Sequence, residues 1–315
     1  MAIVASEASV RSTVEQALRG SKRDLRGRLF EAALLGSLLL SLAVLLALLW
    51  SVLQTALPVF AERGFDFVTS NMSRIESRAG VRQAVIGSLL LIAFVFVVAV
   101  PLGVAAAIYL QEYAKDTKLN RLLIANIRNL AGVPSIVFGI LGLVVFVQAF
   151  RVVTGPEVYG KSIISGGLTL SVLVIPIVIL VSMEALRAVP TSIREAAYGV
   201  GATRWEVVRS HVLPYAAPGI FTGVILSLAR AFGETAPLLL VGAVTGYLSP
   251  GLGGSLLEVL QGQYTALPTI VFSWSRQPGD EWRELTAAAI IVLLVVIMIV
   301  NAAAIVLRNR YERKW

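Results

Sequence analysis

The chain alternates between long apolar stretches and shorter polar segments. An α-helix needs about 20 predominantly apolar residues to cross the hydrocarbon of a bilayer, and six stretches approach or exceed that length. They are residues 29–57, 84–110, 130–150, 163–183, 213–244 and 285–307. The first stretch exceeds the about 7–15 apolar residues of a cleaved signal peptide, and a long polar segment precedes it. The pattern therefore predicts an all-α membrane protein with six transmembrane helices, the first of which is retained.

The composition narrows the possible functions. Of the 315 residues, 57% are hydrophobic and 15% are charged, whereas soluble domains carry about 25% charged residues. The chain has no cysteine and a single histidine, His211, so it offers no thiolate nucleophile and no His-rich metal site. We expect no catalytic residue, no metal and no cofactor in this chain, and a membrane-bound enzyme is the weakest of the functional hypotheses.

The distribution of basic residues predicts the orientation. Residues 1–28, 111–128, 184–212 and 308–315 together carry 18 Lys and Arg, whereas the alternating segments 61–82, 151–162 and 246–284 carry 8. By the positive-inside rule, both termini lie in the cytoplasm. The net charge of +8 is then a sign of membrane topology and of contact with membrane lipid, and we expect no nucleic-acid partner.

Residues 155–162 match the Walker A pattern letter for letter, from Gly155 to Lys161 and Ser162. That pattern binds phosphates only where a strand precedes it and where the loop can offer its backbone amides. Here an apolar helix precedes it, Pro156 has no amide, and the charge distribution places it outside the cell. We therefore expect an external turn rather than a nucleotide site.

The cytoplasmic segment 184–212 has the pattern of two short helices joined by a turn. Ser192 with Glu195, and Thr203 with Glu206, each match a capping box, and Gly201 between them can adopt the backbone angles of a turn. We expect a compact helical finger that docks on a cytoplasmic partner. Two alternatives are packing against the chain's own helices alone and a DNA-binding helix-turn-helix. The second is unfavourable because both ends of the finger are tethered to membrane helices.

The fifth apolar stretch contains two charged residues, Arg230 and Glu234, near its middle. A charge at the centre of a bilayer costs about 2.5–3.5 kcal/mol on insertion scales, so both side chains should face protein or water. They are four residues apart and can partly neutralise each other. Pro237 cannot donate to the carbonyl of Gly233, so we expect a kink there.

The charged pair admits two interpretations. It is either a buried ion pair that holds helices together or part of a passage for an anion, because a guanidinium presents a planar fork of donors that suits phosphate or carboxylate. The Glu234 carboxylate would accept a hydrogen bond from a protonated oxygen. That combination favours hydrogen phosphate over sulfate.

Several motifs resemble a known family. The residues Glu195, Ala196 and Ala197, followed by Gly201 and then by Leu213 and Pro214, resemble the EAA loop of ABC importer permeases, although an aliphatic residue usually stands where His211 does. Residues 228–239 resemble the permeases of phosphate ABC importers, the PstA family more than the sister PstC family. Residues 133–139, 184–190 and 268–272 are similar to the same permeases, and the resemblance extends from about residue 84 to the C-terminus.

The resemblance implies a fold and a domain organisation. The fold is a bundle like that of type I ABC importer permeases. Residues 1–28 would form a cytoplasmic segment, 29–80 the first transmembrane helix and an external loop, and 81–310 the permease domain with its coupling loop at 184–212. The chain would lie in the bacterial inner (plasma) membrane as a multi-pass protein.

The resemblance also implies functional residues and partners. Phosphate would pass Arg230, Gly233, Glu234 and Thr235, and the EAA-loop residues would couple to an ATPase. The implied partners are a cytoplasmic dimer of ATP-binding subunits (PstB-like), a second permease subunit (PstC-like), an external phosphate-binding protein (PstS-like) and inorganic phosphate. ATP would bind to the partner ATPase and not to this chain. The alternatives are a permease for another oxyanion such as sulfate or molybdate, the sister phosphate permease, and an ion-coupled secondary transporter that needs no ATPase.

Overall fold

The computed structural model describes residues 25–243 and 255–311, and the chain divides into two compact units, residues 1–52 and 53–315. The described part of the first unit belongs to α2 (Leu25–Arg63), a continuous helix whose apolar side chains are exposed along residues 25–49. In the second unit, the described residues form helices joined by turns, without a strand.

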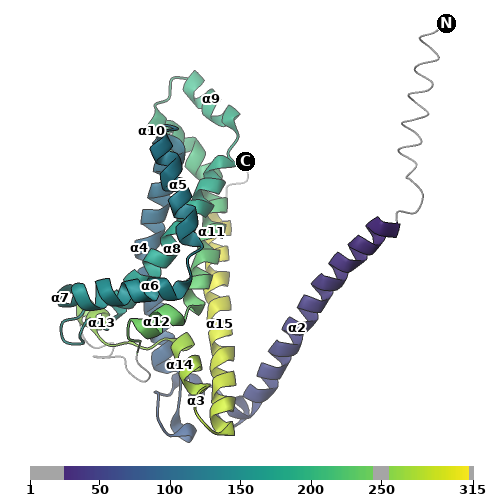
Figure 1. Cartoon of the computed structure of the whole chain (residues 1–315), viewed down its shortest axis with the longest axis vertical. Helices are drawn as coiled ribbons and strands as arrows, with labels where there is room; N and C mark the ends of the chain where they lie inside the picture. The colour runs from purple at the N-terminus through teal and green to yellow at the C-terminus, as the bar shows by residue number, and fades with distance from the viewer. Residues whose placement is uncertain (1–24, 244–254, 312–315) are drawn as a thin grey trace. The chain divides into compact units, whose positions relative to one another are not determined.

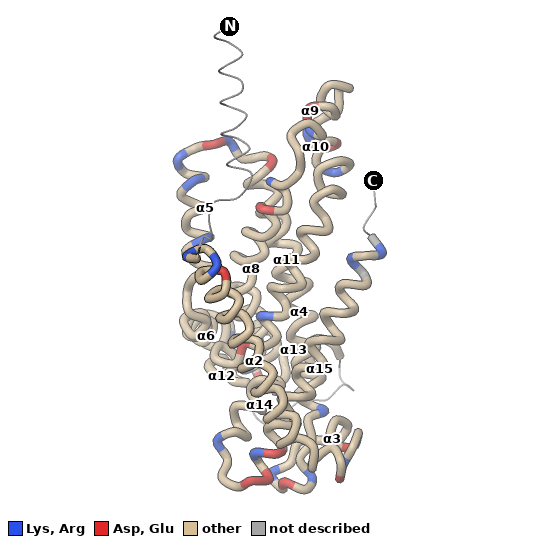
Figure 2. The backbone as a smooth tube through the Cα atoms, turned by 90° about the vertical axis from the view of Figure 1, so that its right-hand side faces the viewer, with Lys and Arg blue, Asp and Glu red and all other residues tan. Residues whose placement is uncertain are grey.

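Long helices form the centre of the second unit. They are α4 (Arg82–Ile108), which the π-helical turn η2 (Tyr109–Tyr113) extends, α8 (Ile163–Arg187), α11 (Leu213–Gly233) and α15 (Asp280–Tyr311). They run side by side, with α8 between α4 and α11, and with α15 against α11 (Figure 1). Charged residues gather toward the two ends of this bundle (Figure 2). Together with α2, five described helices are long and apolar enough to span a membrane, which confirms the all-α membrane fold.

The central helix α8 is held by close contacts with its neighbours. It is the most buried of the candidate spans: 67% of its 18-residue apolar segment is buried inside the protein. A Cβ atom built on Gly103 of α4 would lie 2.6 Å from Val178 Cγ1, and one built on Gly223 of α11 would lie 2.5 Å from Val181 Cγ2. Because neither position leaves room for a side chain, the backbones of α4 and α11 approach α8 directly.

The third apolar stretch is not the straight helix that the sequence predicts. Residues 118–149 form α5 (Lys118–Ala131), α6 (Ser135–Gly142) and the π-helix η3 (Leu143–Ala149), and α5 meets the α6–η3 segment at an angle of 98°. The break falls at Gly132–Pro134, where Pro134 has no amide to continue the helix of α5. The predicted helix over 130–150 is therefore found from Ser135 to Ala149 only, and the sixth candidate span is a bent pair that begins at Lys118.

This bent pair must return the chain to the opposite end of the bundle. Arg194, just beyond the end of α8, bonds to Glu112 at the end of η2, so α4 and α8 finish at the same end. Near their starts, Gly87 of α4 and Gly166 of α8 contact the consecutive residues Thr265 and Tyr264. Since α4 and α8 are parallel, the segment between them crosses once. The six-crossing topology is consistent with this arrangement.

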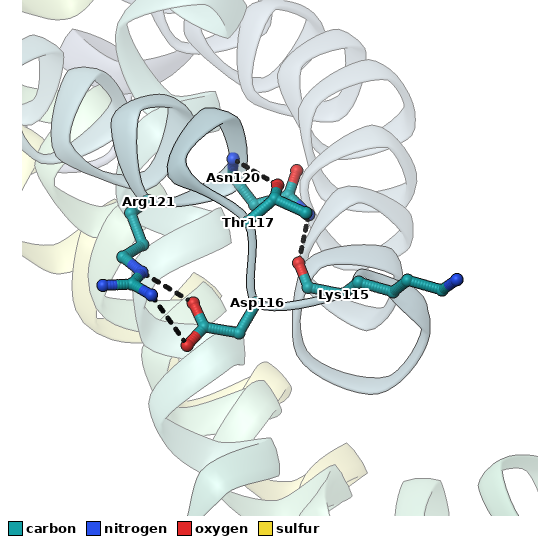
Figure 3. A network of polar contacts seen from close by, with 5 residues as sticks. All are labelled: Lys115, Asp116, Thr117, Asn120 and Arg121. Carbon is teal, nitrogen blue, oxygen red and sulfur yellow. Dashed lines mark hydrogen bonds and ion pairs between the residues drawn. The ribbon is translucent and has the colours of Figure 1, made fainter.

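Polar contacts fix the turn between η2 and α5 (Figure 3). The Thr117 hydroxyl caps α5 by accepting a hydrogen bond from the Asn120 amide at 3.2 Å, and the Asn120 side chain donates to the Lys115 carbonyl at 2.6 Å. Arg121 Nε lies 2.8 Å from Asp116 Oδ1 in an exposed ion pair. The direction in which α5 leaves the turn is thus set by its own first residues.

Short helices complete the described structure. They are α3 (Asp66–Thr69), η1 (Glu76–Arg78), α7 (Arg151–Thr154), α9 (Thr191–Gly199), α10 (Arg204–Val207), η4 (Val208–Val212), α12 (Ala236–Leu240), α13 (Leu256–Gln261) and α14 (Leu267–Trp274). The Walker-like residues 155–162 follow the helix α7 rather than a strand, and Ser162 caps α8 by accepting from the Ser165 amide. They form a turn, as expected.

Candidate functional site

The fifth apolar stretch is interrupted at the charged pair. The helix α11 ends at Gly233 and α12 begins at Ala236, so the stretch breaks where the sequence predicts only a kink. Glu234 has an extended backbone (φ −73°, ψ 123°) and leaves the helix. The cause is Pro237 in the first turn of α12: a proline fits the start of a helix but not its interior.

Arg230 and Glu234 pair across this break, as their spacing predicts. Arg230 Nε lies 3.5 Å from Glu234 Oε1, and the side chains are 56% and 16% exposed. The partner of the arginine therefore belongs to the same segment and not to a neighbouring helix. Within this chain the Glu234 side chain is sheltered while more than half of the Arg230 side chain remains accessible. A guanidinium has five N–H donors, so one ion pair leaves donors for another group.

The two interrupted segments of the chain meet beside this pair. The helix α6, which starts at the Pro134 break, packs against α12. On the other side, the buried residues Ala231 and Phe232 line a cavity of about 10 Å³, which is closed by Ser88 and Ala266 among others. A cavity of that size holds about one water molecule. In this conformation, the apolar face of the break is closed.

The helical finger predicted within residues 184–212 consists of α9, α10 and η4. Thr203 and Glu206 form the predicted capping box: the Glu206 carboxylate accepts from the Thr203 amide at 2.7 Å, and the Thr203 hydroxyl accepts from the Glu206 amide at 3.4 Å. Gly201 adopts a φ of +85°, and its amide donates to the Tyr198 carbonyl at 2.9 Å. The predicted turn between two helices is therefore confirmed.

The other predicted capping box, between Ser192 and Glu195, is wrong. The helix α9 begins at Thr191, and the residue before it, Pro190, has an extended backbone and no capping side chain. Ser192 consequently lies inside the first turn, where it cannot act as the N-cap. The fixed φ of the proline, which suits the residue before a helix, starts α9 earlier than the serine would.

The finger exposes both its EAA-motif residues and large apolar side chains. Glu195 and Ala196 are exposed, whereas Ala197 is buried. The exposed apolar patch consists of Tyr198, Val200 and Trp205, and Val200 alone is 85% exposed. Leu213 and Pro214 start α11 directly after the finger. Such a patch at one end of a bundle is typical of a docking surface.

Sequence reasoning missed two residues that anchor the finger, Arg194 and Glu112. Arg194 Nη2 lies 2.7 Å from Glu112 Oε1, and the same guanidinium donates to the carbonyls of Val189 at 2.7 Å and Leu186 at 2.9 Å. The two residues are 82 positions apart, so no local pattern joins them. The sequence signal was weak: Glu112 follows the second apolar stretch closely, but Arg194 lies inside the finger, with Glu184 and Arg187 nearer to the end of the fourth stretch.

Sequence comparisons identify relatives of the chain. The family model described as "Binding-protein-dependent transport system inner membrane component" matches residues 99–313. The chain is 32% identical over 241 residues to the phosphate transport system permease protein PstA of Mycobacterium leprae, covering 75% of this chain and 74% of the relative. It is 30% identical over 252 residues to the phosphate transport system permease protein PstC of Mesorhizobium japonicum, with 71% and 77% covered.

A Bacillus subtilis relative, the probable ABC transporter permease protein YqgI, is 35% identical over 185 residues, which is 59% of this chain. The chain spans about 60% of the length of that protein. Among solved structures, the chain is similar to a bacterial ABC transporter involved in the import of alginate. The superposition covers 91% of this chain and 97% of the transporter chain, with 18% identity and a TM-score of 0.65. The MetNI methionine ABC transporter covers 74% and 95%, with 20% identity and a TM-score of 0.54. These similarities show the fold of type I ABC importer permeases.

Proposed function

Because the chain belongs to the family of binding-protein-dependent transport system inner membrane components, we propose that it is the transmembrane permease subunit of an ATP-driven phosphate importer. The observation that carries the proposal is the accessible guanidinium of Arg230 at a helix break inside an apolar stretch. The names of the PstA and PstC relatives support phosphate as the substrate. The chain would contribute the passage, and a partner would hydrolyse ATP.

The passage runs past the break in the fifth stretch. Arg230 offers a fork of N–H donors to a phosphate oxygen, and its pairing with Glu234 keeps the arginine oriented while no anion is bound. Gly233 and Thr235 flank the carboxylate and give the chain the change of direction that the pair needs. A guanidinium in apolar surroundings is costly, so its accessible position favours transport over a purely structural ion pair.

Glu234 makes the passage selective for a protonated anion. A carboxylate repels an anion that has lost every proton, but it accepts a hydrogen bond from one that retains a hydroxyl. Hydrogen phosphate keeps such a hydroxyl near neutral pH and sulfate does not. This chemistry favours phosphate over the sulfate or molybdate alternative.

The finger couples the passage to a cytoplasmic ATPase dimer. The exposed patch of Tyr198, Val200 and Trp205, beside Glu195 and Ala196, is the surface that would seat in the ATPase. Ala197 packs underneath, Gly201 shapes the turn, and Leu213 and Pro214 pass the motion to α11. Closure of the ATPase dimer would then rock the helices between inward-open and outward-open states.

The proposed importer is assembled from this chain and several partner subunits. Both termini lie in the cytoplasm, with residues 1–28 as a cytoplasmic segment and 81–310 as the permease domain. A second permease subunit completes the passage, and an external phosphate-binding protein delivers the substrate. The chain resembles both PstA and PstC proteins at similar identity, and the PstA assignment rests on the sequence of residues 228–239.

Reconstituted transport tests the proposal. Proteoliposomes containing the ATPase, the second permease and the binding protein should take up radiolabelled phosphate with ATP when this chain is present, and excess sulfate should not compete. Uptake that persists without this chain would refute the permease role. Uptake without any ATPase would favour a secondary transporter, and equal competition by sulfate would favour the broader oxyanion permease.

A further inference from the structure

Arg194 lies next to Glu195 in α9, but its side chain contacts the ends of two long helices. Its Nη1 donates to the Val189 carbonyl at 2.7 Å, and its Nη2 donates to the Leu186 carbonyl at 2.9 Å. The last carbonyls of an α-helix have no partner within the helix. Arg194 donates to Leu186 in the last turn of α8 and to Val189, two residues beyond the helix, and thereby fixes α9 of the finger to the end of α8.

The same guanidinium binds Glu112 of η2, the continuation of α4. Two bonds join them, Nη2 to Oε1 at 2.7 Å and Nε to Oε2 at 3.4 Å. The side chains are only 19% and 9% exposed, so water and salt screen this pair far less than they screen a surface pair. The two-pronged geometry also restricts the relative orientation of the two helices.

A second contact joins the finger to the same turn. The guanidinium carbon of Arg204 in α10 lies 5.1 Å from the ring centre of Tyr113, so both helices of the finger hold η2. The finger continues through its backbone into α8 on one side and α11 on the other. The finger has no backbone connection to α4, so it contacts the end of α4 through the side chains of Arg194 and Arg204.

We propose that the Glu112–Arg194 pair is the link through which a movement of the finger carries α4 together with α8. Both are positioning residues, because they act on the passage through the helices they join. The proposal rests on the proposed function, since it requires an ATPase that pushes the finger. The backbone passes the movement to α8 and α11, and the packing of α4 on α8 moves the body of α4 with them. Without the pair, the end of α4 beside the finger would follow this movement incompletely.

The first test measures coupling in the complete reconstituted complex. Glu112→Gln keeps the shape of the side chain but leaves Arg194 without its counter-charge. We expect the number of phosphates imported per ATP hydrolysed to fall by about fivefold or more, the size of a typical coupling effect, while the ATPase still co-purifies. Asp116→Asn is the matched control, because it removes the carboxylate of an exposed two-pronged arginine pair near the same turn (Figure 3). An unchanged ratio in Glu112→Gln, or an equal loss in Asp116→Asn, would overturn the proposal.

A chemical rescue separates a mechanical link from a general effect on folding. The chain has no cysteine, so Glu112→Cys combined with Arg194→Cys introduces the only two thiols of this subunit. In a complex whose other subunits carry no reactive cysteine, a short bismaleimide should restore the phosphate-to-ATP ratio that the unlinked double variant loses. Linked protein that remains uncoupled would contradict the proposal.

The last test first measures the chain with the pair intact, so one of its two arms does not depend on whether a variant folds. Spin labels on Leu102→Cys of α4 and Ser192→Cys of α9, both exposed positions, report the distance between the two helices. ATP should leave this distance unchanged in the otherwise unaltered chain and should change it when Glu112→Gln is added. A change in the unaltered chain would refute the link. Failure of the unaltered complex to import phosphate would instead refute the proposed function, without altering this distance measurement.

Discussion

Pro237 of α12 lies against Gly139 of α6, so closely that a Cβ atom on Gly139 would lie 2.7 Å from Pro237 Cα. This contact brings together the two interruptions of the chain, the one at Pro134 and the one beside Glu234. Each interruption removes backbone hydrogen bonds from a helix, which is tolerated within a membrane only where protein surrounds it. The shape of the break that carries Arg230 therefore depends on α6.

Gly139→Val should destabilise the protein and reduce transport. The added side chain would meet the backbone of Pro237, and overpacking of this kind costs about 1–3 kcal/mol. Thermal unfolding of the purified complex and phosphate uptake both measure the effect. Gly132→Ala is the control, because the nearest atom to its Cβ would be the Asn129 carbonyl oxygen at 3.5 Å, an ordinary contact. Equal melting temperatures for the two variants would show that α6 tolerates displacement from α12.

Arg230→Ala should reduce phosphate uptake by about tenfold or more while the complex still assembles, since a hydrogen bond to a charged group contributes about 1.5–3 kcal/mol. Arg230→Lys keeps the charge but loses the planar fork, so its uptake should lie between that of the alanine variant and the native protein. Uptake by the assembled complex, normalised to the amount of this chain, is the measurement. If the alanine variant took up phosphate as fast as the native protein, the Arg230–Glu234 pair would have only a structural role.

Glu234→Gln should weaken discrimination between phosphate and sulfate. The amide keeps an acceptor oxygen but loses the negative charge that repels sulfate, and it adds donors that sulfate can use. We expect the ratio of the inhibition constants for sulfate and phosphate, in competition against labelled phosphate, to fall by about tenfold, the value of one charge-assisted hydrogen bond. If this ratio were the same as in the native chain, Glu234 would not contribute to the discrimination between phosphate and sulfate.

Gly201→Val should uncouple or release the ATPase without preventing membrane insertion. At a φ of +85°, a side chain costs about 1–2 kcal/mol whatever the surrounding space, and a β-branched one is the least compatible. Gly199→Ala is the control: its Cβ meets no atom within 4 Å and its φ is not positive, so it should leave coupling unchanged. ATPase retained on the affinity-purified chain measures the difference, and equal retention in both variants would argue against a role for the turn.

Tyr264→Phe should be neutral or stabilising, by up to about 1 kcal/mol. The side chain is fully buried, and within the described part of the chain its hydroxyl has no hydrogen-bond partner. Removing the hydroxyl therefore removes the cost of burying an unpaired polar group. Burial also raises the pKa of Tyr264, so the phenol stays protonated and no ionised form enters the comparison. Thermal unfolding measures the change. A loss of more than about 1 kcal/mol would mean that the hydroxyl finds a partner in the assembled complex.

Most of the fold follows from the lengths of the apolar stretches, and the exception has a clear physical cause. Counting apolar residues finds α4, α8 and α15, because each is one uninterrupted helix, and it finds α11 as part of a longer stretch that breaks after Gly233. It fails at residues 130–150, because hydropathy does not record direction, and a proline after a glycine turns the chain by 98° without changing its apolar character. Pro134 was the available signal in the sequence.

The candidate site likewise contains contacts that the sequence predicts and one contact that it does not predict. The Arg230–Glu234 pair and the Thr203–Glu206 box were predictable, since spacings of three and four residues bring side chains together locally. The pairing of Arg194 with Glu112 was not, since it depends on α4 and α8 running parallel and ending together. A single sequence does not contain that tertiary information in any local pattern.

The bent pair has a consequence for how the protein enters the membrane. The α5 half carries Lys118, Arg121 and Arg128 among its leucines and buries none of its residues, and it packs alongside α8. Basic residues oppose the insertion of an isolated helix, by about 2.5–3.5 kcal/mol each on translocon scales where they stand at its centre and by less toward its ends. We therefore expect this segment to insert stably only once α8 is available for it to pack against. The order of membrane integration would then differ from the order of translation, because α5 precedes α8 in the chain.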